Sequence, residues 1–229
     1  MLPTLLCVLA PTLGAPRAFA QAEAGTRIEA PILKLRPTQF NLGMIEVRSR
    51  ADKMRRMPRA ELQSCIDGHP APVAVGPGGA FYIFDRHHFA RALLEIGETR
   101  MVAVIKADWS GLSEDEFWRR MSERQWVWLY DEGRGPLRPS ELPGTVAEMT
   151  DDPYRSLARA VRKAGGWRKS SVPFAEFQWA DYLRPRISRG MIRDEFNKAV
   201  EEGIVLAHAP AAESLPGYAP AGGNGVFRH

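Results

Sequence analysis

The sequence has little cysteine, with only Cys7 and Cys65 among 229 residues. This excludes the dense disulfide framework of small secreted domains, because Cys65 alone could form no internal disulfide if a leader containing Cys7 were removed. Cys65 lies in the segment from Leu62 to Ile66, where a buried thiol on a helix is expected rather than a nucleophile. The Cys and His spacings of zinc sites are also missing. The fold must therefore rely on a hydrophobic core.

Several other patterns are missing. The sequence contains no internal repeat, no Walker-type phosphate loop and no glycine fingerprint of dinucleotide-binding folds, so a nucleotide would have to bind by another route. Long apolar runs are missing as well. The apolar stretch from Leu2 to Leu13 is short and contains Pro3 and Pro11, so we expect no stable membrane insertion.

The same stretch predicts export. The segment Ala18-Phe19-Ala20 before Gln21 has the small-x-small pattern of a signal-peptide cleavage site. We therefore expect residues 1–20 to be a signal peptide, cleavage after Ala20, and a periplasmic or secreted mature protein. No Lys or Arg precedes the apolar run, so a cytoplasmic product is the alternative. Residues 21–30 are polar and small, and we expect them to form a disordered lead.

The chain has the composition of a soluble globular protein, with 45% hydrophobic and 25% charged residues. Its net charge of +4 permits a nucleic-acid or nucleotide partner without requiring one. The strongest basic cluster lies between Arg48 and Arg59, and its simplest interpretation is a solvated helix face.

Apolar patterns predict short strands and helices in the first half of the chain and helices alone in the second. The expected strands cover residues 32–35, 72–75, 81–84 and 101–107, and the expected helices cover residues 59–66, 90–97, 114–125, 153–164, 174–183 and 191–202, with one more ending near Pro58. The Gly- and Pro-containing loop from Asp131 to Pro143 is the expected boundary. We expect the basic side chains on the helix after Pro153 to be solvated, and the tail from Ala209 to be loosely ordered.

One polar stretch, Asp85-Arg86-His87-His88, lies where the strand at residues 81–84 leads into the next helix. A helix N-terminus favours anions, and two adjacent histidines titrate near neutral pH. Asp85 adds a carboxylate that could orient a histidine or hold a cation. In the structural alternative, Asp85 is the N-cap of the helix and the histidines are partly exposed residues of its first turn.

The sequence resembles the ParB/sulfiredoxin superfamily in several separate segments. The carriers of this likeness are Leu62 to Ile66, Pro72 to Val75, Phe81 to His88 with Ala92, and Gly97 followed by Val102 to Ile105. More closely, it resembles the group called ParB-like nucleases in the segments Leu35 to Phe40, Asp151 to Ala158, Phe174 to Phe177 and Leu215 to Tyr218.

The resemblance implies an α+β fold: a ParB/sulfiredoxin-like core at residues 31–130 with a small mixed sheet, followed by a helical C-terminal part at residues 145–218 packed on it. It also implies that the strand-to-helix box faces a phosphate-bearing partner. In the relatives this box reads Gly-Glu-Arg-Arg or Asp-Gly-His-His-Arg. Here Arg86 replaces the glycine and Phe89 replaces the arginine, so either Arg86 or Arg91 supplies the phosphate-binding charge or the site is rebuilt or inactive.

These features lead to the hypothesis of a nuclease that hydrolyses nucleic-acid phosphodiester bonds. His87 and His88 would act as base and acid, Asp85 would hold a divalent metal ion (magnesium or manganese), and Glu46 is a second metal or base candidate. The alternatives are a nucleotide-binding or phosphotransferase protein that uses the same box, and a non-catalytic exported binding protein.

Overall fold

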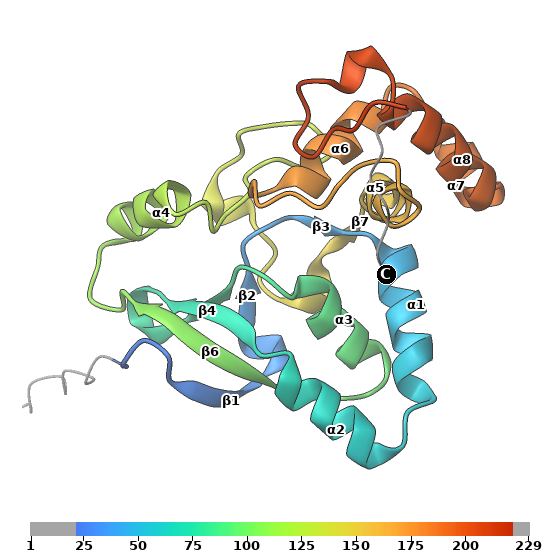
Figure 1. Ribbon diagram of the computed structural model, residues 1–229. Coiled ribbons are helices and arrows are strands. Elements are labelled where there is room, and N and C mark those ends of the chain that lie inside the picture. Colours follow the sequence, from blue (N-terminus) through green and yellow to red (C-terminus); the bar gives the residue numbers. More distant parts are fainter. Residues whose placement is uncertain (1–21, 222–229) are drawn as a thin grey trace, which may run out of the picture.

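The computed structural model describes residues 22–221 and has an α+β fold (Figure 1). The predicted signal peptide, including Cys7, lies outside the described residues. The strands are β1 (Arg27–Pro31), β2 (Leu35–Pro37), β3 (Asn41–Leu42), β4 (Ala71–Val75), β5 (Phe81–Ile83), β6 (Arg100–Asp108) and β7 (Thr150–Asp151). The helices are α1 (Met44–Arg55), α2 (Arg59–Gly68), α3 (His87–Glu95), α4 (Glu114–Glu123), α5 (Pro153–Lys163), α6 (Ala175–Leu183), α7 (Arg189–Asp194) and α8 (Phe196–Ala207).

The main sheet has the strand order β1-β6-β4-β5-β2. β1 pairs antiparallel with β6 and β4 antiparallel with β5, whereas β6 and β4 pair in parallel, as do β5 and β2. In the parallel pair that forms one edge, Leu35 lies opposite Phe81. This arrangement confirms the α+β class and the small mixed sheet expected from the sequence.

The predicted disordered lead at residues 21–30 is wrong over its second half. Residues 27–31 form β1, which pairs along β6 from Arg27 opposite Val104 to Pro31 opposite Arg100. The side chain of Ala30 is 1% exposed. The composition of this segment does not predict a strand. It forms one because its backbone hydrogen-bonding groups pair with those of β6, about seventy residues away.

Helices cover both faces of the sheet because neighbouring residues along a strand point to opposite sides. Val73 packs in the cluster that contains the apolar residues of α1, α2 and α3, including Met54. The next residue, Ala74, packs in a second cluster with Phe117 of α4. Ser113 caps α4, since its side chain accepts a hydrogen bond from the backbone N–H of Glu116.

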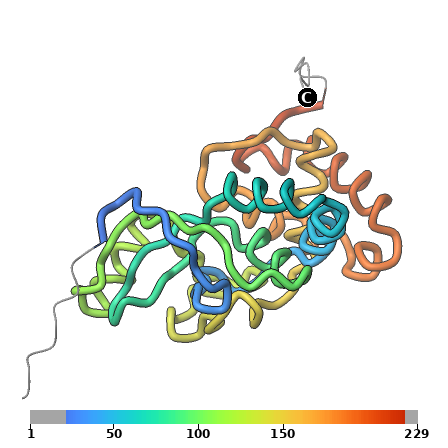
Figure 2. Tube along the Cα trace, turned by 90° about the horizontal axis from the view of Figure 1, so that it is seen from below, coloured from blue at the N-terminus to red at the C-terminus, as the bar shows by residue number. Residues whose placement is uncertain are grey.

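The helices α5 to α8 enclose a separate apolar cluster around Trp179, whose ring stacks on Trp167. These helices, orange to red, gather at the end of the molecule away from the dark blue β1 (Figure 2). The single last helix predicted over residues 191–202 is wrong, because α7 ends at Asp194 and α8 continues to Ala207. Within residues 22–221, no helix combines the length and the apolar character needed to cross a bilayer.

The tail from Ala209 is also more ordered than its composition predicts. Ala212 is fully buried, and Trp179 Nε1 donates a hydrogen bond to the Pro216 carbonyl at 2.8 Å. Gly217 accepts a hydrogen bond from the Arg168 backbone N–H. The prediction of a loose tail is therefore wrong up to Tyr218, because these contacts tie the segment onto the α5–α8 cluster.

Two contacts hold the helical part against the sheet part: a short strand pairing and a helix–helix contact. β3 pairs in parallel with β7, with Asn41 opposite Thr150, and α1 packs on α5. Gly43, the N-cap of α1, lies so close to α5 that an added Cβ would be 2.4 Å from Ser156 Oγ and 2.6 Å from its backbone nitrogen. Only glycine allows this approach, which places the first turn of α1 beside α5. The division into parts at residues 31–130 and 145–218 stays a prediction.

Candidate functional site

The strand-to-helix box lies on the wall of a cavity of about 440 Å³. β5 ends at Ile83 and α3 begins at His87, so Asp85 and Arg86 form the connection and are exposed. Asp85 Oδ1 accepts a hydrogen bond from the Arg86 backbone N–H at 2.6 Å. Arg86 itself is the N-cap of α3 and has a left-handed backbone, with φ of 71°. Glycine adopts this conformation most easily, which explains why the resembling sequences carry glycine there.

Both histidines of the box bind the backbone of the segment at residues 38–43. His87 is 3% exposed, and its Nε2 accepts a long hydrogen bond from the Thr38 N–H at 3.4 Å. The Nε2 of His88 accepts a hydrogen bond from the Gly43 N–H at 3.0 Å. A neutral ring that accepts at Nε2 carries its proton on Nδ1. Neither ring therefore has a free Nε2 lone pair with which to take a proton from water.

The electrostatic surroundings of the histidines also favour the neutral form. Burial, followed by the neighbouring His88 and Arg155, lowers the pKa of His87 to about 3, against a hydrogen bond with the Ile83 backbone that raises it. Burial likewise lowers the pKa of His88 to about 3, with Arg155 as the next contribution. Both rings are thus neutral at pH 7. Their catalytic role stays a prediction, and the role visible in the structure is to hold the chain that leads into α1.

Glu46 lies in the first turn of α1, and its side chain is 9% exposed. Its Oε1 pairs with Arg50 at 3.0 Å and with Arg159 of α5 at 3.0 Å. Its Oε2 has no hydrogen-bond partner and lies 3.7 Å from His88 Nε2. That contact is not an ion pair, because the ring is neutral and its Nε2 already accepts from Gly43. Glu46, which lines the cavity, therefore keeps one buried carboxylate oxygen without a hydrogen-bond partner.

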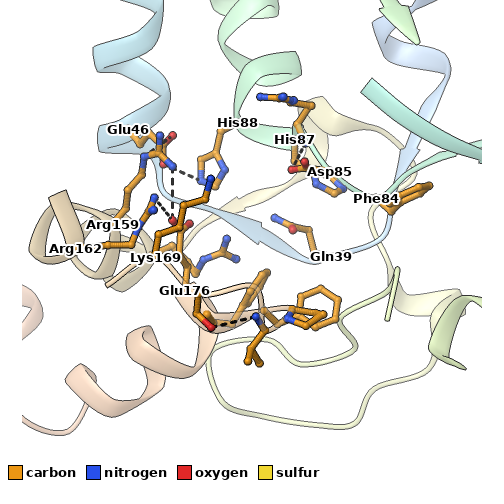
Figure 3. Close-up of a pocket in the computed structure, with 18 of the residues that line it drawn as sticks. Gln39, Glu46, Phe84, Asp85, His87, His88, Arg159, Arg162, Lys169 and Glu176 are labelled. Atoms are coloured by element: carbon orange, nitrogen blue, oxygen red, sulfur yellow. Dashed lines mark hydrogen bonds and ion pairs between the residues drawn. The ribbon is translucent and has the colours of Figure 1, made fainter. Parts of the chain in front are cut away.

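A second carboxylate enters the cavity from α6. Glu176 pairs with Arg162 at 2.8 Å and lies 3.6 Å from Arg159. Figure 3 shows Glu46 and His88 close to this group of charged side chains. The first turns of α1, α3 and α6 and one face of α5 thus meet at one place.

Arg155 of α5 is the most deeply buried cation of the cavity, with 5% exposure. Its guanidinium carbon lies 3.3 Å from the centroid of the Phe177 ring. Its Nε and Nη1 have no hydrogen-bond partner. Burial lowers the pKa of Arg155 to about 10, so the side chain remains a cation at pH 7. A buried donor without a partner costs about 1–3 kcal/mol, and more when it is charged.

The cavity has a positive excess of charge. Its cationic side chains outnumber its carboxylates, which are Glu46, Asp85 and Glu176. The cations are Arg50, Arg86, Arg155, Arg159, Arg162 and Lys169. Burial strengthens the field of such charges, because little water screens them. The site is therefore suited to an anionic ligand.

The structure brings most of the predicted site residues together. Glu46, Asp85, Arg86, His87 and His88 all line the cavity.

Arg91 does not line the cavity. Its Nε pairs with Glu95, and its Nη1 donates to the Ala147 carbonyl at 2.9 Å. These contacts anchor the segment before β7, and a phosphate-binding role of Arg91 stays a prediction.

The basic face of α5 was interpreted from the sequence as solvated, and this is wrong for Arg155. Arg155, Arg159 and Arg162 recur at helical spacing, so they lie on one face of α5. That face points at α1 and α6 and not at solvent, as the ion pairs of Arg159 with Glu46 and Glu176 show. The helical spacing of the three arginines indicates that they share one face of α5. The sequence does not reveal which elements cover that face.

The side chains present do not form a site for a metal ion by themselves. Among residues 22–221, no group of three or more His, Cys, Asp or Glu side chains is placed to hold one. Glu46 and Glu176 are paired with arginines, and Asp85 lies alone on the rim. The expected magnesium or manganese ion stays a prediction.

Comparison with known proteins gives one family and a similar crystal structure. A family model described as "Putative ParB-like nuclease" matches residues 28–185. The crystal structure of protein Atu1540 from Agrobacterium tumefaciens is 35% identical in sequence, with a TM-score of 0.77, and the match covers 85% of this chain and 98% of that one. A comparison with curated proteins found no match.

Proposed function

This chain belongs to the family of ParB-like nucleases, and from that premise we propose that it hydrolyses a phosphodiester bond of a nucleic acid in the cavity. The observation that carries the proposal is Glu46, a buried carboxylate with a free oxygen beside a cluster of arginines. A carboxylate of this kind can accept a proton from water, and arginines can bind the oxygens of the phosphate.

In the proposed reaction, a water molecule attacks the phosphorus atom while Glu46 Oε2 accepts its proton. The bond from phosphorus to the leaving sugar oxygen breaks, and that oxygen takes a proton from solvent. Arg155, Arg159 and Arg162 stabilise the charge that develops on the other phosphate oxygens. The ion pairs with Arg50 and Arg159 hold the Glu46 side chain in place. None of these steps uses a metal ion.

His88 acts as a positioning residue in this proposal. Its hydrogen bond fixes Gly43, the N-cap of the helix that carries Glu46 one turn later. Ser156 of α5 adds a second restraint, because its hydroxyl accepts a hydrogen bond from the Glu46 N–H at 3.3 Å. The carboxylate and the α5 arginines are thus held together by the same contacts.

A basic surface next to the cavity favours a nucleic-acid chain over an isolated small molecule as the ligand. Glu46, Arg50 and Arg159 line both the cavity and a neighbouring depression between α1 and α5. Lys53 and Lys163 also line that depression, and both are exposed. No ion pair joins either lysine to a carboxylate within residues 22–221. Lysines so placed would bind phosphates of the nucleic-acid chain next to the cleaved bond.

The test is plasmid nicking by the purified protein, with and without added magnesium or manganese, beside Glu46→Gln. We expect Glu46→Gln to lower the nicking rate about a hundredfold or more, which is typical for the loss of a general base. Asp52→Asn is the matched control, because Asp52 lies on the same helix and its side chain is 57% exposed. Nicking at the wild-type rate by Glu46→Gln, or no nicking by any form, would refute the proposal.

Nucleotide binding, with or without phosphotransfer, is the second candidate. The observation in its favour is the lining of the cavity, where the rings of Trp167, Phe174 and Phe177 stand near the arginines. Aromatic rings of this kind can stack on a base. A rise in melting temperature on adding a nucleoside triphosphate, in a protein that nicks no plasmid, would support this candidate.

A further inference from the structure

Arg155 lies in the wall of a cavity that already contains carboxylates, and it has buried donor atoms without a partner. Its Nε and Nη1 have no hydrogen-bond partner, although the side chain is only 5% exposed. Glu46 and Glu176 pair with Arg50, Arg159 and Arg162 and form no hydrogen bond with Arg155. Buried guanidinium groups are almost always bonded, so these free donors require an explanation.

We propose that Arg155 is the floor of a binding site for a phosphate group. The inference rests on the proposed function in one respect, because it places the phosphate in the same cavity. It goes further by naming the anchoring group.

The orientation of Arg155 supports a fixed recognition group. Its guanidinium stacks on Phe177, with 3.3 Å between the guanidinium carbon and the ring centroid. Phe177 is itself packed against Trp128 and Phe174, with centroid distances of 4.9 and 5.6 Å. Packing against a fixed ring restricts the rotation of the guanidinium, whose planar N–H fork can bind two oxygens of a phosphate.

Two neighbours extend the same set of donors. The Nε atoms of Arg159 and Arg162 also lack a hydrogen-bond partner, and both residues lie on the same face of α5 as Arg155. Arg159 Nε forms an ion pair with Glu46 Oε1 at 3.0 Å. The geometry of this contact is not that of a hydrogen bond, so the Nε–H donor has no partner. A tetrahedral phosphate has enough acceptor oxygens to bond several forks at once, whereas a carboxylate has two oxygens. The donor set therefore favours phosphate.

The ligand could be a terminal phosphate of a nucleic acid, an internal phosphodiester or free phosphate. All of them share the tetrahedral anion, and binding measurements separate them. The probes are inorganic phosphate, a 5′-phosphorylated dinucleotide and the same dinucleotide without its 5′-phosphate. Equal affinity for the two dinucleotides would assign Arg155 to the internal diester, and tighter binding of the phosphorylated form would assign it to a terminal phosphate.

The deciding experiment measures inorganic phosphate binding by calorimetry for wild type, Arg155→Lys and Arg193→Gln. Arg193→Gln is the control, because Arg193 lies on α7 with a side chain that is 77% exposed. We expect Arg155→Lys to weaken binding at least tenfold and the control to leave it unchanged. Equal affinity in wild type and Arg155→Lys, or no phosphate binding by wild type, would overturn the inference.

A second readout keeps the test valid if the variant does not fold. In wild type, the ¹⁵N resonance of Arg155 Nε should shift on adding phosphate and stay in place with chloride at equal ionic strength. An unmoved resonance at saturating phosphate contradicts the inference. The two proposals also fail separately: phosphate binding without hydrolysis refutes only the proposed reaction, and hydrolysis that Arg155→Lys leaves intact refutes only the role of Arg155.

Discussion

The two sides of the cavity use their buried polar groups in opposite ways. On the α3 side, His87 and His88 each accept a hydrogen bond from a backbone N–H. On the α5 side, Arg155 is as deeply buried as His87 but has two donor atoms with no partner. Satisfied buried groups stabilise a fold, whereas unsatisfied ones lower its stability and are kept for another reason. The comparison shows a structural role for the histidines, whose catalytic role stays a prediction, and supports the proposal that the arginine binds a ligand.

The largest expected effect is the loss of stability in acid. The folded-state pKa of both histidines is about 3, below the ordinary value of 6.5, so the unfolded chain binds protons first as the pH falls. Stability is therefore full above pH 6.5 and decreases between pH 6.5 and about 3. At pH 5 each histidine should cost on the order of 2 kcal/mol of unfolding free energy.

Urea unfolding at pH 7 and pH 5 measures this effect. The double variant His87→Gln, His88→Gln removes the titration of both rings while the carboxylates remain, so its stability should change less with pH than that of wild type. Parallel pH dependence in the two proteins would show that the histidines do not titrate as described.

The next largest effect is that of His88→Ala. A purely catalytic histidine, as the sequence suggested, would leave the melting temperature nearly unchanged. The structure predicts instead a loss of about 1–3 kcal/mol, because the Gly43 N–H loses its acceptor. Chemical denaturation checks this, with His69→Ala as a control whose ring bonds only within its own helix end. Unchanged stability of His88→Ala would move His88 back among the catalytic candidates.

The smallest effect concerns the surface outside the cavity. The binding constant for a single-stranded oligonucleotide should fall as the salt concentration rises. Replacing Lys53 or Lys163 by Gln should reduce the slope of its logarithm against the logarithm of the salt concentration by about one per lysine. Inorganic phosphate binding should not change, because both lysines lie in the neighbouring depression. Lys106→Gln, an exposed residue of β6, is the control. An unchanged salt slope would remove the lysines from the nucleic-acid path.

Local patterns in the sequence predicted much of the fold. Most strand and helix positions followed from apolar spacing, but residues 32–34, expected to be part of a strand, form a 3-10 helix. Ser113 caps α4, and Asp152 caps α5 by accepting a hydrogen bond from the Tyr154 N–H at 3.1 Å. Such signals lie within a few residues of the structure they determine, so the sequence alone displays them.

What could not be predicted depends on contacts between distant segments. β1 is a strand because β6 is beside it, and the tail near Pro216 is ordered because Trp179 binds its carbonyl. The candidate site shows the same limit. Its box was found from the sequence, but the burial of Arg155 against Phe177 arises only when α5 and α6 pack together.

The contrast between the hydrogen-bonded histidines and the unpartnered Arg155 is tested most directly by the free energy of unfolding of Arg155→Met, measured with and without phosphate. Methionine keeps the apolar contact with Phe177 and removes the buried unpartnered charge. We predict that the variant is at least as stable as wild type without phosphate, and that phosphate stabilises wild type alone. A variant that loses stability in phosphate-free buffer, or gains as much from phosphate as wild type, would contradict the ligand role of Arg155.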